Sequence, residues 1–267
     1  MMDYSAKKVM VGLSAGINSA ALLVWLGSLP AEQRPSEIHL YYAHFIEHSA
    51  DSLPFVWDLV RWAEGRFEKV VYTQTDNSIL SFFETSKMIP HPANSPCSRL
   101  LKILPMMAYM AANGLDLDLV GYVREEKRRA TKMREKYGED SKQKDFPILQ
   151  ESNEWCFDIV RQQLGWYPAI YDKRWNDSAF VVWMEANIHR LTDDAQRRVR
   201  KKLGTSDRVF KHNNCLPCKN MALEDMLPVE FYFPQYQSNA VALSARLRKY
   251  WGRDKEAYYT LFALSQV

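Results

Sequence analysis

A run of small and polar residues, Ser14-Ala-Gly-Ile-Asn-Ser19, joins an apolar segment at 8–13 to a second one at 17–29. Small residues let a backbone approach a phosphate closely, and a following helix presents N–H groups and its positive dipole end. The hydroxyls of Ser14 and Ser19 can donate hydrogen bonds to phosphate oxygens. The spacing therefore indicates a phosphate-binding loop. The alternative is an ordinary strand–turn–helix connection in which Asn18 or Ser19 caps the helix.

Thiols could support a second kind of chemistry. The chain has four cysteines: Cys97, Cys156, Cys215 and Cys218. In a reducing compartment, a Cys-x-x-Cys pair such as Cys215/Cys218 points to metal binding or redox chemistry. A free, reduced pair without metal is the alternative. Cys156 stands between two aromatic residues, a setting that favours a buried, unreactive thiol.

Basic residues crowd two stretches of the chain, 124–136 and 197–202. Such clusters attract phosphate-rich partners, including nucleic acids and phosphorylated substrates. They are also typical of a helix face that is merely solvated. Because the net charge is only +3, the distribution of charge says more than its total.

Strand-like and helix-like segments alternate around these residues. Short apolar runs that end at turns predict strands, and apolar residues at helical spacing predict helices. The expected strands are 8–13, 37–45, 69–75 and 116–123, and the expected helices are 17–29, 53–67, 77–87 and 97–113. A loop with three prolines, 88–96, interrupts this order. The alternation predicts an α/β fold with a twisted parallel sheet and helices on both faces.

In such sheets, ligands bind at the carboxyl ends of the strands. The segments that follow the four expected strands are Ser14–Ser19, Ala43–His48, Thr73–Asn77 and Gly121–Arg129. We therefore expect Ala43 and Gly121 to contact a nucleotide together with the Ser14–Ser19 loop.

Beyond about residue 140 the pattern changes to short helices, aromatic residues and loops. The expected organisation is a nucleotide-binding α/β domain at 1–140 and an irregular, mainly helical region at 141–267. The N-terminus lacks the apolar stretch of a signal peptide, and no apolar run approaches the roughly 20 residues that span a bilayer. We expect a soluble, cytoplasmic protein with no membrane partner, for which homo-oligomerisation is an open option.

The Ser14–Ser19 loop resembles the Ser-Gly-Gly-x-Asp-Ser signature of PP-loop ATP pyrophosphatases, which grips the pyrophosphate of ATP. Two residues differ, because Ala15 replaces a glycine and Asn18 replaces the aspartate. Alanine fits this position if its φ is negative. A neutral amide is a weaker partner for Mg²⁺ than a carboxylate, so magnesium use and turnover stay open.

Three further stretches resemble the phosphoadenosine phosphosulfate (PAPS) reductase-like branch of this superfamily. Cys97-Ser-Arg-Leu-Leu-Lys102-Ile-Leu-Pro105 resembles its Cys-x-x-x-x-Lys-x-x-Pro helix start. Gly121-Tyr-Val-Arg-Glu-Glu-Lys-Arg-Arg129 resembles its Gly…Glu-Ser-x-x-Arg segment after the fourth strand. The family's tail is matched, in order, by Pro147-Ile148, Trp155, Asp158-Ile159, Tyr171 and Cys215-Leu-Pro-Cys218.

This resemblance implies roles for individual residues. The phosphates of ATP would contact Ser14, Ala15, Gly16, Ile17, Asn18 and Ser19. The implied catalytic residues, which position and neutralise phosphate groups and Mg²⁺, are Lys102, Arg129 and Asn18. The implied ligands of an iron–sulfur cluster or Zn²⁺ are Cys97, Cys215 and Cys218, with Cys156, His212 or an exogenous group as the fourth.

The activity implied by the resemblance is adenylyl transfer, in which a substrate oxygen attacks the α-phosphate of ATP and pyrophosphate leaves. Sulfur transfer, or modification of a nucleotide or nucleic acid, would follow. The alternative is a degenerate protein that binds a nucleotide without turnover, which Asn18 favours. Sulfonucleotide reduction is disfavoured, because family reductases carry a catalytic cysteine near the C-terminus and no cysteine follows Cys218 here.

Overall fold

The computed structural model describes residues 3–87, 96–137, 143–213, 215–216 and 223–251. Most of the expected proline-rich loop, 88–95, and Cys218 lie outside these residues. The chain forms two compact units. Unit 1 comprises the described residues up to His44, together with Ala50–Asp76 and Leu100–Pro168. Unit 2 comprises Phe45–Ser49, Asn77–Arg99 and the described residues from Ala169 onward.

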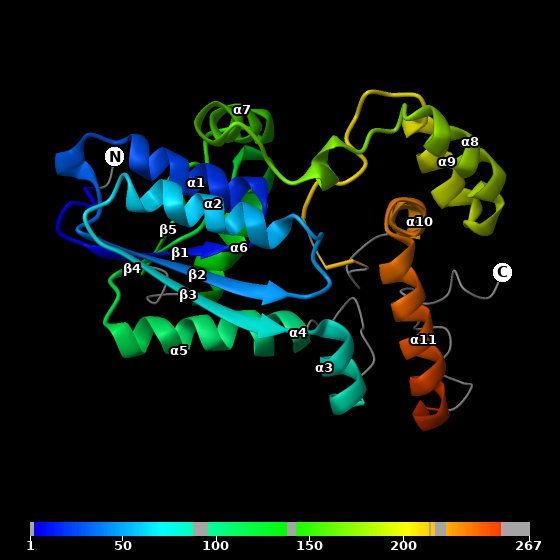
Figure 1. Ribbon diagram of the computed structural model, residues 1–267, viewed down its shortest axis with the longest axis horizontal. Helices are drawn as coiled ribbons and strands as arrows, with labels where there is room; N and C mark the ends of the chain where they lie inside the picture. The colour runs from blue at the N-terminus through cyan, green and yellow to red at the C-terminus, as the bar shows by residue number, and fades with distance from the viewer. Residues whose placement is uncertain (1–2, 88–95, 138–142, 214, 217–222, 252–267) are drawn as a thin grey trace. The chain divides into compact units, whose positions relative to one another are not determined.

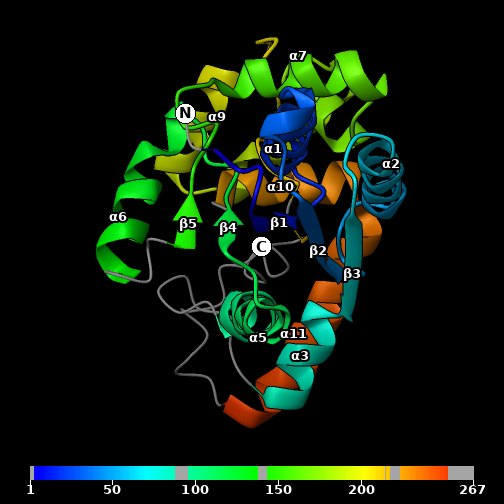
Figure 2. The same cartoon turned by 90° about the vertical axis from the view of Figure 1, so that its left-hand side faces the viewer.

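A parallel sheet forms the centre of unit 1. Its strands are β1 Lys8–Leu13, β2 Glu37–Phe45, β3 Val70–Asn77, β4 Leu117–Leu119 and β5 Lys144–Asp145. Their order across the sheet is β3-β2-β1-β4-β5 (Figures 1 and 2). The predicted α/β class and parallel sheet are confirmed.

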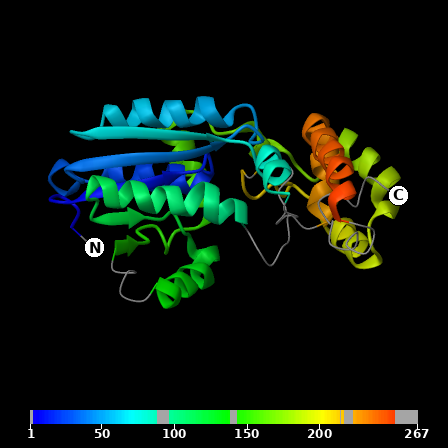
Figure 3. The same ribbon diagram turned by 90° about the horizontal axis from the view of Figure 1, so that it is seen from below.

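Helices cover both faces of this sheet. They are α1 Ile17–Ser28, α2 Ser52–Glu64, α5 Leu104–Asn113, α6 Lys127–Tyr137 and α7 Asn153–Leu164, with short turns η1 Ala31–Gln33 and η3 Arg124–Glu126. On one face α1 packs against α2 and α7 (Figure 2), and α5 lies across the other face (Figure 3). Because α1 is enclosed by the sheet and α7, its apolar residues are buried nearly all round.

Two strands differ from the sequence-based expectation. β4 ends at Leu119 rather than at residue 123, because the chain turns away from the sheet there and carries Gly121 against Ser14–Ser19, the segment that leads into the first turn of α1 and is called here the α1 loop. β5 was not predicted, since Lys144-Asp145 is two charged residues with no apolar run. It pairs with β4, and the buried Asp118 carboxylate of β4 forms an ion pair with Lys144.

The expected helix at 97–113 is present but irregular. It begins with α4 Pro96–Ser98, continues as a π-helical turn, η2 Arg99–Ile103, and becomes α5 at Leu104. Pro105 lies in the first turn of α5. Because proline has no N–H and its ring crowds the preceding turn, a wider turn before it is expected.

Unit 2 is mainly helical. Its elements are α3 Ile79–Ser86, η5 Ala169–Asp172, α8 Ser178–Asn187, η6 Ile188–Arg190, α9 Asp193–Lys202, α10 Leu223–Tyr232 and α11 Pro234–Trp251. α10 packs against α8, α9 and α11. Rings of Phe180, Phe231 and Tyr232 form its aromatic core, with centroids 4.8–5.3 Å apart.

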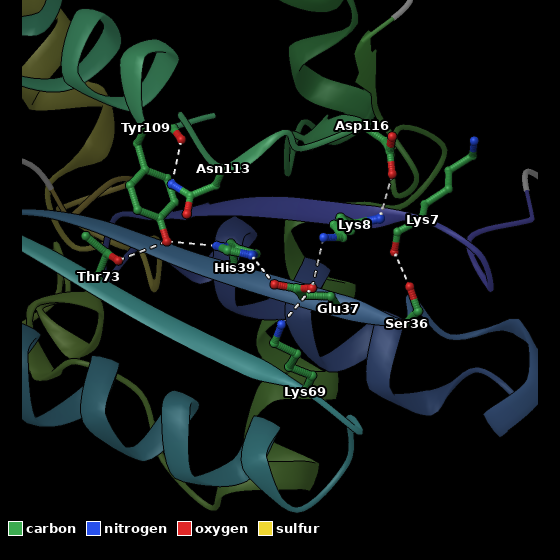
Figure 4. A network of polar contacts seen from close by, with 10 residues as sticks. All are labelled: Lys7, Lys8, Ser36, Glu37, His39, Lys69, Thr73, Tyr109, Asn113 and Asp116. Atoms are coloured by element: carbon green, nitrogen blue, oxygen red, sulfur yellow. Dashed lines mark hydrogen bonds and ion pairs between the residues drawn. The ribbon is translucent and has the colours of Figure 1, made fainter. Parts of the chain in front are cut away.

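The amino-terminal edge of the sheet carries an ionic cluster around Glu37 (Figure 4). The Glu37 carboxylate lies 3.0 Å from Lys69 Nζ, 2.8 Å from His39 Nε2 and 3.5 Å from Lys8 Nζ. Hydrogen bonds from Lys69 and then His39 lower the pKa of Glu37 from 4.5 to about 2. The cluster therefore joins the first residues of β1 and β2 to the segment that enters β3.

The same cluster continues under α5. His39 Nδ1 lies 2.8 Å from the Tyr109 hydroxyl, which also accepts a hydrogen bond from Thr73 Oγ1 at 3.0 Å (Figure 4). Residues of β2, β3 and α5 are thus linked by one chain of hydrogen bonds.

Candidate phosphate-binding site

The strand order places a topological switch point at the carboxyl ends of β1 and β4. From β1 the chain passes through α1 to β2 on one side, whereas β4 and β5 lie on the other side of β1. Connections that leave neighbouring strands in opposite directions open a crevice where open α/β sheets bind ligands. The loop at 14–16 leaves β1 at this point, and the segment at 120–123 leaves β4.

The two predicted serine residues brace the first of these loops. Ser14 Oγ accepts a hydrogen bond from the Gly16 N–H at 3.2 Å and lies 3.2 Å from Ser19 Oγ. Ser19 Oγ donates to the Gly16 carbonyl at 3.0 Å and accepts from the Ser14 N–H at 3.3 Å. The structure thus brings both hydroxyls together at the start of α1.

The N-cap of α1 is Gly16, which has no side chain with which to cap the first turn. Capping by Asn18 or Ser19, the alternative considered from the sequence, is therefore wrong. The first turn also contains no acidic residue, so the positive end of the helix dipole is not neutralised there.

Ala15 does not have the negative φ that would make alanine a comfortable replacement for glycine. Its φ is +53°, in the left-handed region that favours glycine. It is also fully buried. The loop therefore keeps the backbone shape of a glycine position while carrying a methyl group, and strain is stored there.

Gly121 holds the two switch-point loops in direct contact. A Cβ atom at Gly121 would lie 2.6 Å from the carbonyl oxygen of Asn18 and 3.2 Å from the backbone nitrogen of Ser19. Only a residue without a side chain permits this approach. Gly121 thus shapes the site through its contact with the α1 loop.

Asn18 is bound by Glu126, which lies in the Gly121–Arg129 segment expected after the fourth strand. Its Nδ2 donates to Glu126 Oε2 at 3.1 Å, and its Oδ1 is buried without a hydrogen-bond partner among the described residues. Glu126 also forms an ion pair with Arg129, whose guanidinium lies 4.8 Å from the centre of the Tyr122 ring. Three of the expected site residues, Asn18, Gly121 and Arg129, are therefore brought together through Glu126 and its loop.

The remaining expected residues of unit 1 are less closely tied to this loop. Ala43 is buried near the end of β2, and Lys102 is half-buried in the π-helical turn η2.

At the carboxyl ends of β2 and β3, His44 Nδ1 lies 3.0 Å from Asp76 Oδ1. Hydrogen bonds from His44 and then Gln74 lower the pKa of Asp76. The sequence did not predict this ion pair, although the two residues lie in the segments Ala43–His48 and Thr73–Asn77 that were expected to follow strands.

The cysteines are described only in part. Cys97 and Cys215 are both buried and both belong to unit 2, and Cys218 lies outside the described residues. Within the described part of the chain, no group of three His, Cys, Asp or Glu side chains is placed to hold a metal ion. Cys156, in α7, is fully buried, and burial raises the pKa of its thiol to about 12. This thiol therefore stays protonated at neutral pH, as its aromatic neighbours predict.

The chain was compared with models of protein families and with curated proteins, and nothing in either set matched it. In the described parts of the chain, none of the helices combines the length and apolar character that a membrane crossing requires.

Proposed function

We propose that this chain binds ATP with its phosphates against Ser14–Ser19 and transfers the adenylyl group to an acceptor, releasing pyrophosphate. The observation that carries the proposal is the start of α1, which lies at the switch point of the sheet behind the serine-braced segment Ser14–Ser19 and has no acidic residue in its first turn. A helix N-terminus at this place supplies backbone N–H groups and positive potential to an anion. The resemblance of the loop to the PP-loop signature supports the same assignment.

The residues present fit the phosphates of a nucleotide. Ser14 and Ser19 hydroxyls now satisfy each other and the Gly16 backbone, and either can turn to donate to a phosphate oxygen. The Arg129 guanidinium lies beside this site through its ion pair with Glu126, and 63% of its side chain is exposed to solvent. In this proposal Arg129 and Lys102 neutralise charge that develops on the leaving pyrophosphate.

The residues present also offer oxygen ligands for a Mg²⁺ ion that accompanies ATP. Asn18 Oδ1 is a buried acceptor without a partner among the described residues, and the Glu126 carboxylate lies beside the same side chain. Carboxylate and amide oxygens are suitable magnesium ligands. When bound, the ion would supply charge neutralisation at the phosphates, while Asn18 and Glu126 hold and orient it.

One observation favours a second candidate function, nucleotide binding without turnover. The Asn18 amide already donates to Glu126, so the position that resembles the family's aspartate is engaged in a contact between loops. A protein of this kind would bind ATP but release no pyrophosphate.

Calorimetric titration with ATP tests the binding step, using Gly16→Val as the variant. The backbone angles of Gly16, φ −84° and ψ 148°, are open to any residue, so valine is compatible with this backbone, and it adds methyl groups where a phosphate would have to approach the main chain. We expect at least a tenfold loss of affinity, about 1.4 kcal/mol. Gly65→Ala, at the end of α2 with φ −80°, is the control and should bind ATP like the wild type. Unchanged affinity of Gly16→Val would place the nucleotide elsewhere.

Pyrophosphate release separates the two candidate functions. The wild type is incubated with ATP, Mg²⁺ and candidate acceptors, and Asn18→Asp is measured in parallel. If turnover is limited because position 18 lacks a carboxylate, Asn18→Asp releases pyrophosphate faster and with a stronger dependence on Mg²⁺. ATP binding without release in both proteins supports the binding-only function, and an unchanged rate and metal dependence removes Asn18 from the metal position.

A further inference from the structure

The helix α6 presents an exposed basic face beside the candidate phosphate-binding site. Lys127, Arg128 and Lys132, called here the α6 cations, are all exposed. Within the described part of the chain, none of the three forms an ion pair or a hydrogen bond through its side chain. Contacts within the described part of the chain therefore do not account for these three charges.

The position of these charges on the helix is unfavourable for stability. Lys127 and Arg128 occupy the first turn of α6, which contains no acidic residue. Positive charges in a first turn oppose the helix dipole and destabilise the helix. Charges that cost stability are expected where they serve a ligand.

The second basic cluster of the chain, in α9, has local explanations. Arg197 and Arg198 both pair with Asp194, at 2.6 and 2.8 Å. The remaining cations, Arg200, Lys201 and Lys202, lie in the last turn of α9, where the helix dipole favours positive charge, and Lys202 also lies over the Trp175 ring at 5.2 Å. Among the described residues, the cations of α9 thus have either a paired carboxylate or a favourable place at the carboxyl end of the helix, whereas Lys127, Arg128 and Lys132 of α6 have neither.

Contacts along its sides hold α6 at the edge of the sheet (Figure 2). Among its described side chains only Ala130 is fully buried. The rings of Tyr122 and Phe146 are stacked with centroids 5.5 Å apart. Arg129 lies over the Tyr122 ring at 4.8 Å, and Arg134 lies over the Phe146 ring at 4.9 Å. These two arginines anchor the helix, so its outer face is free for a partner.

The start of α6 is joined to the candidate phosphate loop. Glu126, which immediately precedes α6, accepts the hydrogen bond from Asn18 Nδ2 at 3.1 Å. A molecule lying along the α6 cations would thus pass beside the α1 loop.

We propose that the α6 cations bind the phosphate backbone of a nucleic acid, a proposal that does not rest on the proposed function. From Lys127 to Lys132 the helix rises about 7.5 Å, the axial length of about two nucleotides of one strand. The charges therefore match successive phosphates of a polymer better than the clustered phosphates of one nucleotide.

Fluorescence anisotropy without ATP tests the surface. The probes are labelled single-stranded RNA, single-stranded DNA and duplex DNA, each titrated with the full chain at several salt concentrations. The test variant is Lys127→Gln/Arg128→Gln/Lys132→Gln. The matched control is Arg197→Gln/Arg200→Gln/Lys201→Gln, which removes the same three positive charges from α9. Because all six side chains are exposed, both variants should fold, which circular dichroism checks.

The wild type is expected to bind at least one probe, and the probe that binds most tightly shows whether the partner is RNA or DNA. The α6 variant should bind at least about tenfold more weakly, and its slope of log affinity against log salt should fall by about 2–3. The α9 control should bind like the wild type. Absence of binding to every probe in about 50 mM salt, or equal losses in both variants, would overturn the proposal.

Calorimetry with ATP on the α6 variant separates this proposal from the proposed function. Unchanged ATP binding together with lost nucleic-acid binding supports both. If even the wild type fails to bind ATP while the α6 effect persists, the proposed function fails and the nucleic-acid surface stands.

Discussion

Gly121→Ala is expected to force apart the two loops that meet at the switch point. The new Cβ would lie 2.6 Å from the Asn18 carbonyl oxygen and 2.9 Å from the Asn18 carbonyl carbon. Both atoms belong to the backbone, so no rotation of a side chain can relieve the clash. The α1 loop and the loop after β4 must therefore separate by several tenths of an ångström or more.

The magnitude follows from two contributions. Overpacking of this kind costs about 1–3 kcal/mol. Separation of the loops also weakens the bond from Asn18 to the Glu126 carboxylate, and a hydrogen bond to a charged group is worth about 1.5–3 kcal/mol. Since that bond is stretched rather than removed, we expect a total of about 2–4 kcal/mol. For a chain of this length the Tm should fall by at least about 4 °C.

Differential scanning calorimetry measures this loss, with Gly65→Ala as the matched control. Gly65 has φ −80°, and a Cβ there would lie 3.6 Å from the nearest atom, the Trp62 carbonyl oxygen. This control should be neutral or up to about 1 kcal/mol more stable, because alanine restricts the unfolded chain. If Gly121→Ala melts within about 1 °C of the wild type, too small a shift for a backbone clash at 2.6 Å, the two loops do not touch as described.

Three other outcomes follow from features described above. Ala15→Gly should stabilise the fold by up to about 1 kcal/mol in chemical denaturation, because it relieves a φ of +53°; a loss of stability would contradict the left-handed backbone. The Glu37 pKa is lowered from 4.5 to about 2, so its stabilising effect is complete above pH 4.5 and is lost as the pH falls through 2. Glu37→Gln should therefore flatten the acid-unfolding profile between these values, followed by circular dichroism, and an unaltered profile would count against the ion cluster. If Cys97 and Cys218 share a cluster or zinc ion, anaerobically purified wild type contains iron or zinc and Cys97→Ser loses it in elemental analysis; a metal-free wild type, or a fully loaded variant, rejects the shared site.

The sequence predicts local features of this fold better than contacts between distant segments. The apolar run at 8–13 and the small residues after it are enough to locate β1 and the start of α1, because both signals are local. The contact between Asn18 and Glu126 joins residues 108 positions apart, and only the parallel pairing of β1 with β4 brings them together. No local pattern contains that information.

The conformation of Ala15 was unpredictable for a different reason. A side-chain type shows which backbone angles are comfortable, and alanine favours negative φ. The observed angle is imposed by the loop that leaves β1 and enters α1, so tertiary structure overrides the local preference. The two-residue strand β5 was not predicted for a similar reason. Its charged residues are paired with other segments, because Lys144 forms an ion pair with Asp118 and Asp145 accepts a hydrogen bond from Tyr4.

The ionic cluster at the amino-terminal edge has a consequence for the opposite edge. Lys8 of β1 lies in register with Glu37 of β2, and their ion pair holds that alignment. A slip of one strand past the other by two residues would keep the buried faces buried but would pull these charges apart. The six residues of β1 transmit the alignment over about 20 Å to the loop at its far end. The ionic cluster therefore sets the position of the α1 loop relative to the sheet. Substitutions in the α1 loop can change the chemistry of the candidate site, but its position is fixed by charged residues at the opposite edge of the sheet, which a ligand at the site does not contact.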